Sequence, residues 1–238
     1  MSWSAHEFEL YVVQHHLGGR VSIFPLLLGN YVPDMFTKWL TYGLEIGPFN
    51  FGVDDPAAFH RGWPGAGFTH SFVFGLAIAG IILLITRSKV WGLSFLIAIW
   101  LQVVTDMADS LGTLALWPFF NENIGIGMWA YAAQEGRYMD AGAYYSSLGF
   151  VMDVGWLVVA LFSLRVMTKT YYREVVLAND PVMQKIARRV PETALLVLYR
   201  AAFFYGFTRL IAWTIWAHVI NDFEWDLSWG GPSWVVPV

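Results

Sequence analysis

The chain has 238 residues, of which 57% are hydrophobic and 18% aromatic, but only 13% are charged. A soluble domain carries roughly 25% charged residues, so the composition argues against a soluble protein and indicates an integral membrane protein. Cysteine is absent, which excludes disulfides, thiolate metal sites and a cysteine nucleophile. The net charge of -4 offers no basic surface for nucleic acid, so no nucleic-acid partner is expected.

The first part of the chain, residues 5–34, predicts a broken or re-entrant apolar segment. Residues 5–17 have mixed polarity, Gly18 and Gly19 interrupt them, and the apolar run 21–32 is too short to cross a bilayer alone. Together they make either one imperfect span or a broken one. No basic and then apolar pattern of a cleavable signal peptide precedes them, so we expect the first residue to be retained.

Four later segments have the continuous apolar character of membrane-spanning helices, which alternating β-barrel strands lack. They are predicted to be transmembrane helices over the ranges 71–87, 91–110, 143–165 and 194–217. The remaining residues 218–238 form an aromatic tail, which we expect along the outer membrane interface or against a partner. The sequence therefore predicts an all-α integral membrane protein with one membrane domain, residues 1–238, in contact with the lipid bilayer.

Basic residues indicate how this domain is oriented. The short turn 87–89 and the segment 165–189 carry most of them and fall on the same side of the predicted topology. The positive-inside rule places that side in the cytoplasm. The loops 43–70 and 106–142 then face the opposite side, and we expect a multi-pass protein of the bacterial inner (cytoplasmic) membrane whose site faces the periplasm.

Residues that bind metal ions are scarce, but several gather at that non-cytoplasmic end. His60 and His70 precede the first helix of the predicted hairpin, and Asp106 and Asp109 end its second helix. Residues three apart on a helix share a face, and paired helices pack about 8–10 Å apart, so these side chains can converge. Asp34, which ends the first apolar run, lies on the same side. Each of these residues also suits a purely structural role at a helix end or turn.

Imidazole and carboxylate ligands suit zinc, manganese or iron. An incompletely ligated ion of this kind activates water for hydrolysis. The convergence of the histidines and aspartates therefore predicts a divalent metal ion as cofactor, with Asp109 as a catalytic ligand.

Short motifs then occur in order along residues 15–120: His15-His16, Leu28-Gly29-Asn30-Tyr31-Val32-Pro33-Asp34, His60-Arg61-Gly62, Thr69-His70-Ser71, Asp109-Ser110-Leu111 and Trp117-Pro118-Phe119. In this order they resemble the membrane-bound metal-dependent hydrolases of bacterial inner membranes, and the resemblance covers about half of the chain. It implies that the metal ligands or their neighbours are His16, Asp34, His60, His70 and Asp109. Arg61 would steady a developing negative charge.

The sequence departs from the pattern of that family at three places. Phe36 stands where the second acid of a Pro-Asp-x-Asp motif belongs, Thr105 stands where a histidine precedes the Asp-Ser motif, and residues 63–68 lengthen the two-histidine motif. His16 poses a further problem, because 18 residues of straight helix would hold it about 27 Å from Asp34. Only a break at Gly18-Gly19 or Pro25 brings it to the site.

Two ionisable residues lie inside predicted spans. Asp153 and Arg209 are each about 12–15 Å from the outer ends of their helices at 1.5 Å per residue. Because a lone charge in the membrane is costly, the sequence predicts a structural ion pair between them, with a transport or proton-relay role as the alternative.

The residues leave two main functions open. The first is a metal-dependent hydrolase that acts on phosphoester or lipid-like substrates at the outer face. The second is a non-catalytic subunit of a larger, energy-converting membrane complex, since Phe36 and Thr105 are what a decayed site would contain. Haem ligation by paired histidines and transport are less favoured, because the histidines lie at helix ends and no internal repeat is found.

Overall fold

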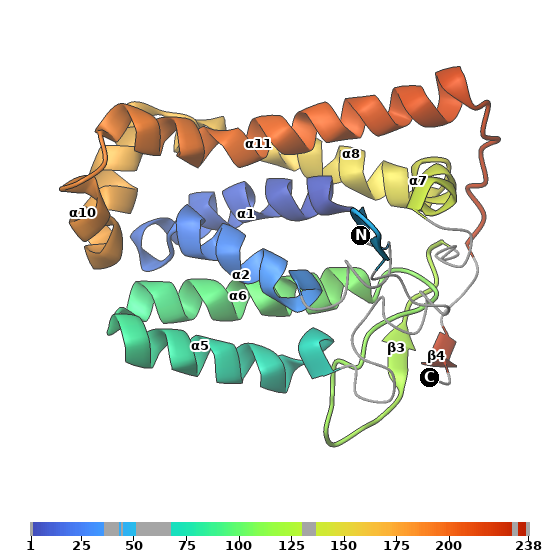
Figure 1. Cartoon of the computed structure of the whole chain (residues 1–238), viewed down its shortest axis with the longest axis horizontal. Coiled ribbons are helices and arrows are strands. Elements are labelled where there is room, and N and C mark those ends of the chain that lie inside the picture. Colours follow the sequence, from blue (N-terminus) through green and yellow to red (C-terminus); the bar gives the residue numbers. More distant parts are fainter. Residues whose placement is uncertain are drawn as a thin grey trace.

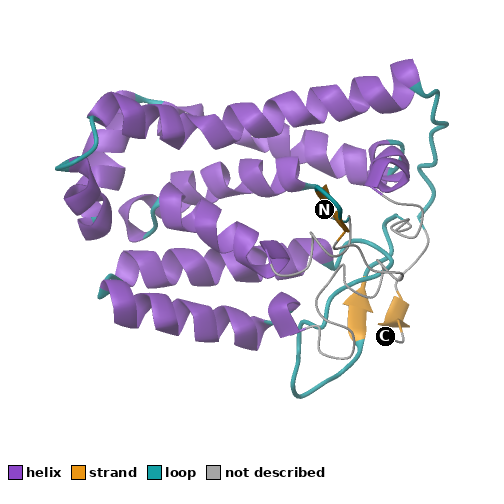
Figure 2. Ribbon diagram, viewed as in Figure 1, coloured by secondary structure: helices purple, strands orange, loops and turns teal. Residues whose placement is uncertain are grey.

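The computed structural model describes residues 2–35, 43, 45–50, 68–129, 137–229 and 233–236. The described chain is mainly a bundle of helices lying side by side, with loops and short strands gathered at one end (Figures 1 and 2). β1 (Glu45–Ile46) pairs with β2 (Phe49–Asn50), and β3 (Asn123–Gly125) pairs with β4 (Ser233–Val236), both antiparallel. The helical class is as predicted, whereas the two small sheets were not foreseen.

Helix α1 (Trp3–Leu17) lies in the middle of the bundle. Ser2 caps its start by accepting hydrogen bonds from the backbone N–H groups of Ser4 and Ala5. The helix packs against α2 (Ile23–Met35), α8 (Leu148–Leu161) and α11 (Glu192–Ile215). Its side chains from position 4 to position 12 are all buried. The polar residues of this stretch are therefore inside the protein.

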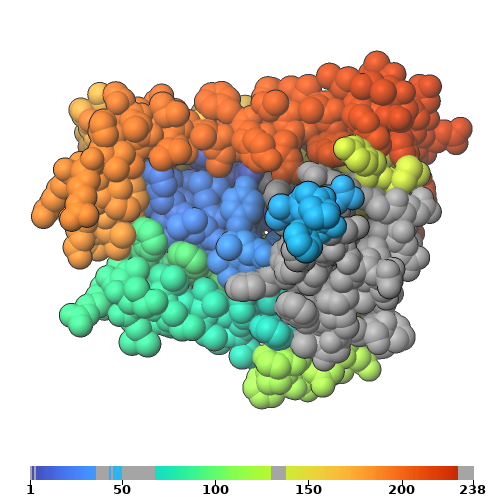
Figure 3. Space-filling model, in the orientation of Figure 1, coloured from blue at the N-terminus to red at the C-terminus, as the bar shows by residue number. Residues whose placement is uncertain are grey.

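The N-terminal segment is broken into two helices, as expected. Gly18 ends α1 with a φ of 56°, a conformation that favours glycine. A short 3-10 turn, Gly18–Arg20, then reverses the chain, and α2 returns beside α1 (Figure 1). Seen from this side, these two helices fill the space between the α10–α11 region and the α5–α6 region (Figure 3). The break brings the end of α2 back towards the start of α1.

Helices α5 (Phe72–Thr86) and α6 (Lys89–Asp106) form the predicted antiparallel hairpin. Ser71 and Ser88 cap their starts, and Arg87 ends α5 in the left-handed conformation with a φ of 53°. The second helix is shorter than the predicted range 91–110, because the chain leaves the helix after Asp106. Because the helix ends at Asp106, Asp109 lies outside it.

The second half of the chain contains more breaks than its apolar pattern suggested. The range 143–165 is divided between α7 (Arg137–Tyr145) and α8, because the Ser147 side chain caps a new helix start. Beyond α8, the basic segment forms short helical pieces: η4 (Leu164–Met167), α9 (Lys169–Tyr171), η5 (Tyr172–Leu177) and α10 (Pro181–Ala187). α11 then crosses the whole bundle and ends in the π-helical turn η6 (Trp216–Ile220).

In the described part of the chain, two helices are long and apolar enough to cross a membrane: Lys89–Asp106 and Glu192–Ile220. α5 and α8 are also apolar, but they have only 15 and 14 residues. The prediction of four clear transmembrane helices is therefore not supported. α5 nearly fills its predicted range 71–87, which is itself short for a full span. The cap at Ser147 begins α8 later than the predicted start at residue 143, and the chain leaves that helix before η4.

Apolar and polar side chains are distributed in a way that suits a lipid environment. Leu84 and Ile85 of α5 and Val197 of α11 are 79%, 74% and 66% exposed. Meanwhile the central α1 buries His6, Glu7 and Glu9 completely or nearly so. Water would favour the reverse arrangement, whereas a bilayer favours apolar surfaces outside and ionisable groups facing the bundle interior.

Candidate functional site

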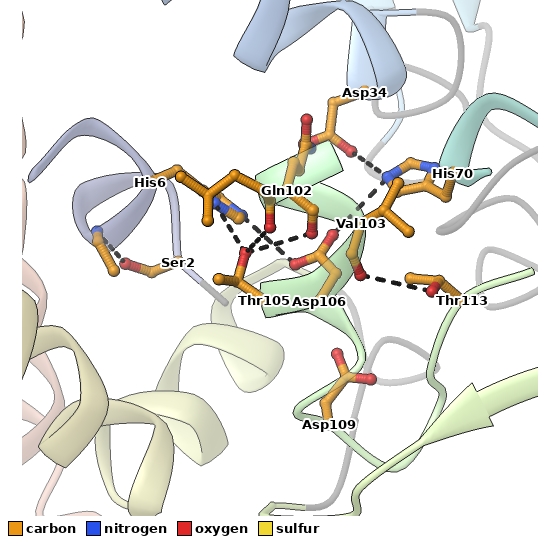
Figure 4. A network of polar contacts seen from close by, with 12 residues as sticks. Ser2, His6, Asp34, His70, Gln102, Val103, Thr105, Asp106, Asp109 and Thr113 are labelled. Atoms are coloured by element: carbon orange, nitrogen blue, oxygen red, sulfur yellow. Dashed lines mark hydrogen bonds and ion pairs between the residues drawn. The ribbon is translucent and has the colours of Figure 1, made fainter. Parts of the chain in front are cut away.

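Four helical elements bring polar side chains together at the end of the bundle opposite the α5–α6 turn. His6 comes from the first turns of α1, Asp34 from the end of α2, His70 from the turn η2 (Phe68–His70), and Asp106 from the last residue of α6 (Figure 4). Each is buried, with at most 4% of its surface exposed. We call these four residues the His/Asp cluster.

Asp106 is the centre of the cluster, because its two carboxylate oxygens face two different histidines. Its Oδ1 lies 3.3 Å from Nε2 of His6, and its Oδ2 lies 3.7 Å from Nε2 of His70. The same Nε2 of His70 lies 3.4 Å from Oδ1 of Asp34. The contacts therefore form a row from His6 through Asp106 and His70 to Asp34.

The opposite side of each imidazole ring is held by a neighbouring group. Nδ1 of His6 lies 3.0 Å from Oε1 of Glu9 and 3.4 Å from the hydroxyl of Thr105. Nδ1 of His70 lies 3.2 Å from the hydroxyl of Thr69. Because both rings are held at Nδ1, both present Nε2 to the carboxylates of the cluster (Figure 4).

Two of the three nitrogen-to-oxygen separations in the cluster, 3.3 and 3.4 Å, suit ligands that share a cation, and the third, 3.7 Å, is slightly longer. Nitrogen-to-oxygen distances of 3.3 to 3.7 Å exceed those of good hydrogen bonds. Two ligands that are each about 2.1 Å from one metal ion lie about 3–3.5 Å apart. Among the described residues, Nε2 of His70 is buried and makes no hydrogen bond. With Glu9 included, the described side chains in contact comprise three carboxylates and two imidazoles, a set that favours a positive charge.

The residues do not yet form a finished metal site. Within the described ranges, no group of three or more histidine, aspartate or glutamate side chains is arranged so that it could hold a metal ion. The row of pairwise contacts explains this result, since His6 and Asp34 occupy its opposite ends. An ion bound by all four residues would have to draw them closer together.

Three of the predicted metal ligands, Asp34, His70 and Asp106, are brought together in the cluster. The predicted ligand His60 and the predicted charge-stabilising residue Arg61 lie outside the described residues. The sequence therefore identified most of the cluster that can be seen.

Asp109 does not lie on a helix face shared with Asp106, contrary to the prediction. α6 ends at Asp106, so Asp109 belongs to the turn that follows. Its Oδ1 accepts hydrogen bonds from the backbone N–H groups of Leu111 and Gly112, at 3.1 and 2.9 Å. The carboxylate thus stabilises the turn, which matches the alternative structural reading of this residue.

His16 is not brought to the cluster. It is exposed in the last turn of α1, at the other end of the helix, where its ring centroid lies 5.1 Å from that of His15. The histidine of the cluster is His6, which the sequence reasoning missed. A signal was available: His6 and Asp34 each lie 14 residues from Arg20 (20 - 6 and 34 - 20) in the turn between the helices. Because two antiparallel helices of equal length extend equally far from the turn that joins them, residues equally distant from that turn lie side by side.

The structure does not pair Asp153 with Arg209 as predicted. Asp153 accepts hydrogen bonds from the hydroxyls of Ser2 and Tyr144, at the start of α1 and on α7. The guanidinium carbon of Arg209 lies over the ring of Tyr205, 5.4 Å from its centroid. The depth of a residue along its helix does not determine the direction in which its side chain leaves the helix, so two residues at similar depth need not meet.

Comparison with known proteins places the chain in a family. A family model described as YdjM inner membrane protein matches residues 11–176, which is more than half of the chain. The match includes Asp34, His70 and Asp106, while His6 precedes it. No curated protein and no solved structure matches the chain. The predicted location in the bacterial inner membrane is supported by this match, although it does not test hydrolysis. The chain belongs to the YdjM inner membrane protein family.

Proposed function

We propose that this protein is a membrane-embedded, metal-dependent hydrolase that acts on phosphoester or lipid-like substrates at the non-cytoplasmic face. The observation that carries the proposal is the position of Asp106, whose two oxygens face the Nε2 atoms of His6 and His70. Buried carboxylates and imidazoles from different helices are costly to assemble in a membrane protein, and such groups generally mark functional sites. Their chemistry suits zinc, manganese or iron.

We assign a role to each residue of the His/Asp cluster and to Thr69 beside it. His6, Asp34, His70 and Asp106 would hold the ion, and Thr69 keeps the ring of His70 oriented through its contact with Nδ1. When bound, such an ion polarises the substrate and lowers the pKa of a water molecule. Because all four residues are buried, the cluster is shielded from bulk water and its electrostatic interactions are strengthened.

The location of the cluster supports a site on the non-cytoplasmic face. Arg87 and Lys89 of the α5–α6 turn lie at the opposite end of the hairpin from Asp106. The basic pieces around α9 and α10 lie at that same opposite end of the bundle (Figure 1). The positive-inside rule assigns that end to the cytoplasm. A multi-pass arrangement, with α5 and α8 completing the membrane domain beside the two longer helices, belongs to the same proposal.

Metal analysis of the purified full-length protein in detergent tests the proposal. We expect about one zinc, manganese or iron ion per chain in the wild type, and its loss in His70→Ala and Asp106→Ala. His16→Ala is the matched control, because it removes an imidazole from the exposed end of α1 and should keep the ion. Chromogenic phosphomonoesters and phosphodiesters then serve as activity probes. A wild-type protein that binds no divalent ion after reconstitution would exclude the hydrolase.

Two observations favour a second function, a non-catalytic subunit of a larger membrane complex. No ready three-ligand group occurs among the described residues, and the hydroxyl of Thr105 occupies a place beside His6. In that case the polar contacts of the cluster only join helices. Co-purification with other membrane-protein subunits in fixed stoichiometry, without any bound metal, would favour this function over hydrolysis.

A further inference from the structure

Glu9 is a fully buried acid with an unusual set of contacts. Its Oε1 lies 3.0 Å from Nδ1 of His6, and both side chains are at most 1% exposed. Its second oxygen, Oε2, is buried and makes no hydrogen bond with any residue that the structure describes. A carboxylate in the interior of a membrane bundle is costly. Its contact with His6 is therefore the interaction that explains its presence.

The geometry around His6 indicates which ring nitrogen carries the proton. The hydroxyl of Thr105 lies 2.8 Å from the carbonyl oxygen of Leu101 and donates to it, so the Thr105 oxygen offers a lone pair to Nδ1 of His6. A Glu9 carboxylate is likewise an acceptor. Two acceptors on one side of the ring favour a proton on Nδ1. Nε2, which faces Asp106, is then the nitrogen that can release a second proton and offer its lone pair to a cation.

We propose that Glu9 is the positioning residue of the site: it accepts the Nδ1–H of His6 and thereby fixes the ring with Nε2 directed at the cation. This inference rests on the proposed function, since it requires an ion between His6 and Asp106. Without an ion, a proton on Nε2 can join Nε2 of His6 to Oδ1 of Asp106, which lie 3.3 Å apart, and a bound cation would take the place of that proton. Hydrogen-bonded partners of this type orient metal-binding histidines and increase their basicity.

The chain offers a matched control for this role in Glu7. It lies two residues from Glu9 on the same helix and is equally buried. Its Oε1 accepts a hydrogen bond from Tyr31, and it makes no hydrogen bond to His6. Replacing either glutamate by glutamine removes one buried carboxylate from α1. Only the Glu9 substitution changes the group that holds His6.

The test is a titration of the detergent-solubilised full chain with Zn²⁺ alone, using a competing chelator to measure affinity. Relative to the wild type, we expect Glu9→Ala to weaken binding by about 10- to 100-fold. Glu9→Gln, whose amide oxygen can still accept the Nδ1–H, should recover most of the affinity. Glu7→Gln should bind as the wild type does. Histidine-selective ¹⁵N spectra of the zinc-bound wild type should show a protonated Nδ1 on His6.

The outcomes separate this inference from the function on which it rests. If the wild type binds zinc and Glu9→Ala binds it equally well, the role of Glu9 is wrong while the metal site remains. The role is also wrong if Glu7→Gln loses as much affinity as Glu9→Ala, or if His6 carries its proton on Nε2 in the zinc-bound protein. If the wild type binds no ion, the proposed function and the inference both fail. Thermal unfolding of the metal-free variants identifies any that do not fold. If Glu9→Ala does not fold, the ¹⁵N spectrum of zinc-bound Glu9→Gln tests the role of Glu9 by showing whether Nδ1 of His6 still carries the proton.

Discussion

The two ends of α1 place the same residue type in opposite surroundings. Near its start, His6 is 1% exposed and lies within 3.3 Å of carboxylate oxygens from Glu9 and Asp106. At its last turn, His16 is exposed, and its ring contact is with the neighbouring His15. The packing of α1 into the bundle therefore decides that His6, and not His16, belongs to a polar site.

Replacing the two histidines separately provides the strongest contrast. His6→Ala should destabilise the protein by roughly 3–5 kcal/mol, because it removes the buried imidazole that both Glu9 and Asp106 contact. His16→Ala should change stability by no more than about 0.5 kcal/mol. Denaturant unfolding in detergent micelles measures both. Equal losses for the two variants would mean that the burial of His6 is not what distinguishes the ends of α1.

The next contrast concerns the space around Glu7, the other buried acid near the start of α1. A Cβ on Gly206 of α11 would lie 2.5 Å from Oε2 of Glu7, so the helices are in close contact there. Gly206→Ala should cost roughly 1–3 kcal/mol through overpacking. Gly80→Ala is the control: nothing lies within 4 Å of a Cβ there, and the substitution should be neutral or stabilising by up to about 1 kcal/mol. A neutral Gly206→Ala would show that Glu7 can move aside.

The apolar runs of the sequence predicted where helices occur, but the exact first and last residues of these helices depend on polar capping side chains. The hairpin of α5 and α6 was predictable because Arg87, Ser88 and Lys89 interrupt two apolar segments. The end of α6 at Asp106 and the start of α8 after Ser147 were not, since the surrounding residues remain compatible with a helix. Helix propensity is a weak guide where tertiary contacts compete with it.

The site was predictable in part, for a similar physical reason. His70 and Asp34 lie next to helix ends that the sequence pattern located, and Asp106 lies near the predicted end of α6, so their convergence followed from the topology. Placing His6 instead of His16 in the cluster required knowing that Gly18 reverses the chain completely. The partners of Asp153 and Arg209 depend on the rotation of each helix about its axis, which the depth of a residue in a span does not determine.

A smaller effect is expected at the basic end of the bundle, where a buried acid has conventional partners. Asp180 caps α10 by accepting from the N–H groups of Val182 and Met183, and it also accepts from Nε1 of Trp91. Asp180→Ala should cost roughly 0.5–2 kcal/mol, the usual effect of losing a helix cap. Glu174→Ala, on the exposed surface nearby, serves as the control. If Asp180→Ala lowers the free energy of unfolding more than His6→Ala does under the same conditions, the expected order of the two effects is wrong.

The smallest effect is expected in the exposed tail, where hydrogen bonds change a pKa without supporting the fold. Oδ1 of Asp226 accepts from the hydroxyl and the backbone N–H of Ser228, at 2.5 and 3.0 Å, and these bonds lower the pKa of Asp226 below its ordinary value. Any stability from this carboxylate is complete above its unfolded pKa and is lost as the pH falls through the lowered one. Ser228→Ala should raise the pKa of Asp226 in a carboxyl NMR titration, while the unfolding temperature at pH 7 stays constant. An unchanged pKa would show that the bonds do not persist in solution. A lowered unfolding temperature would instead show that the hydrogen bonds of exposed Asp226 stabilise the fold, contrary to the expected difference from the buried acids of α1.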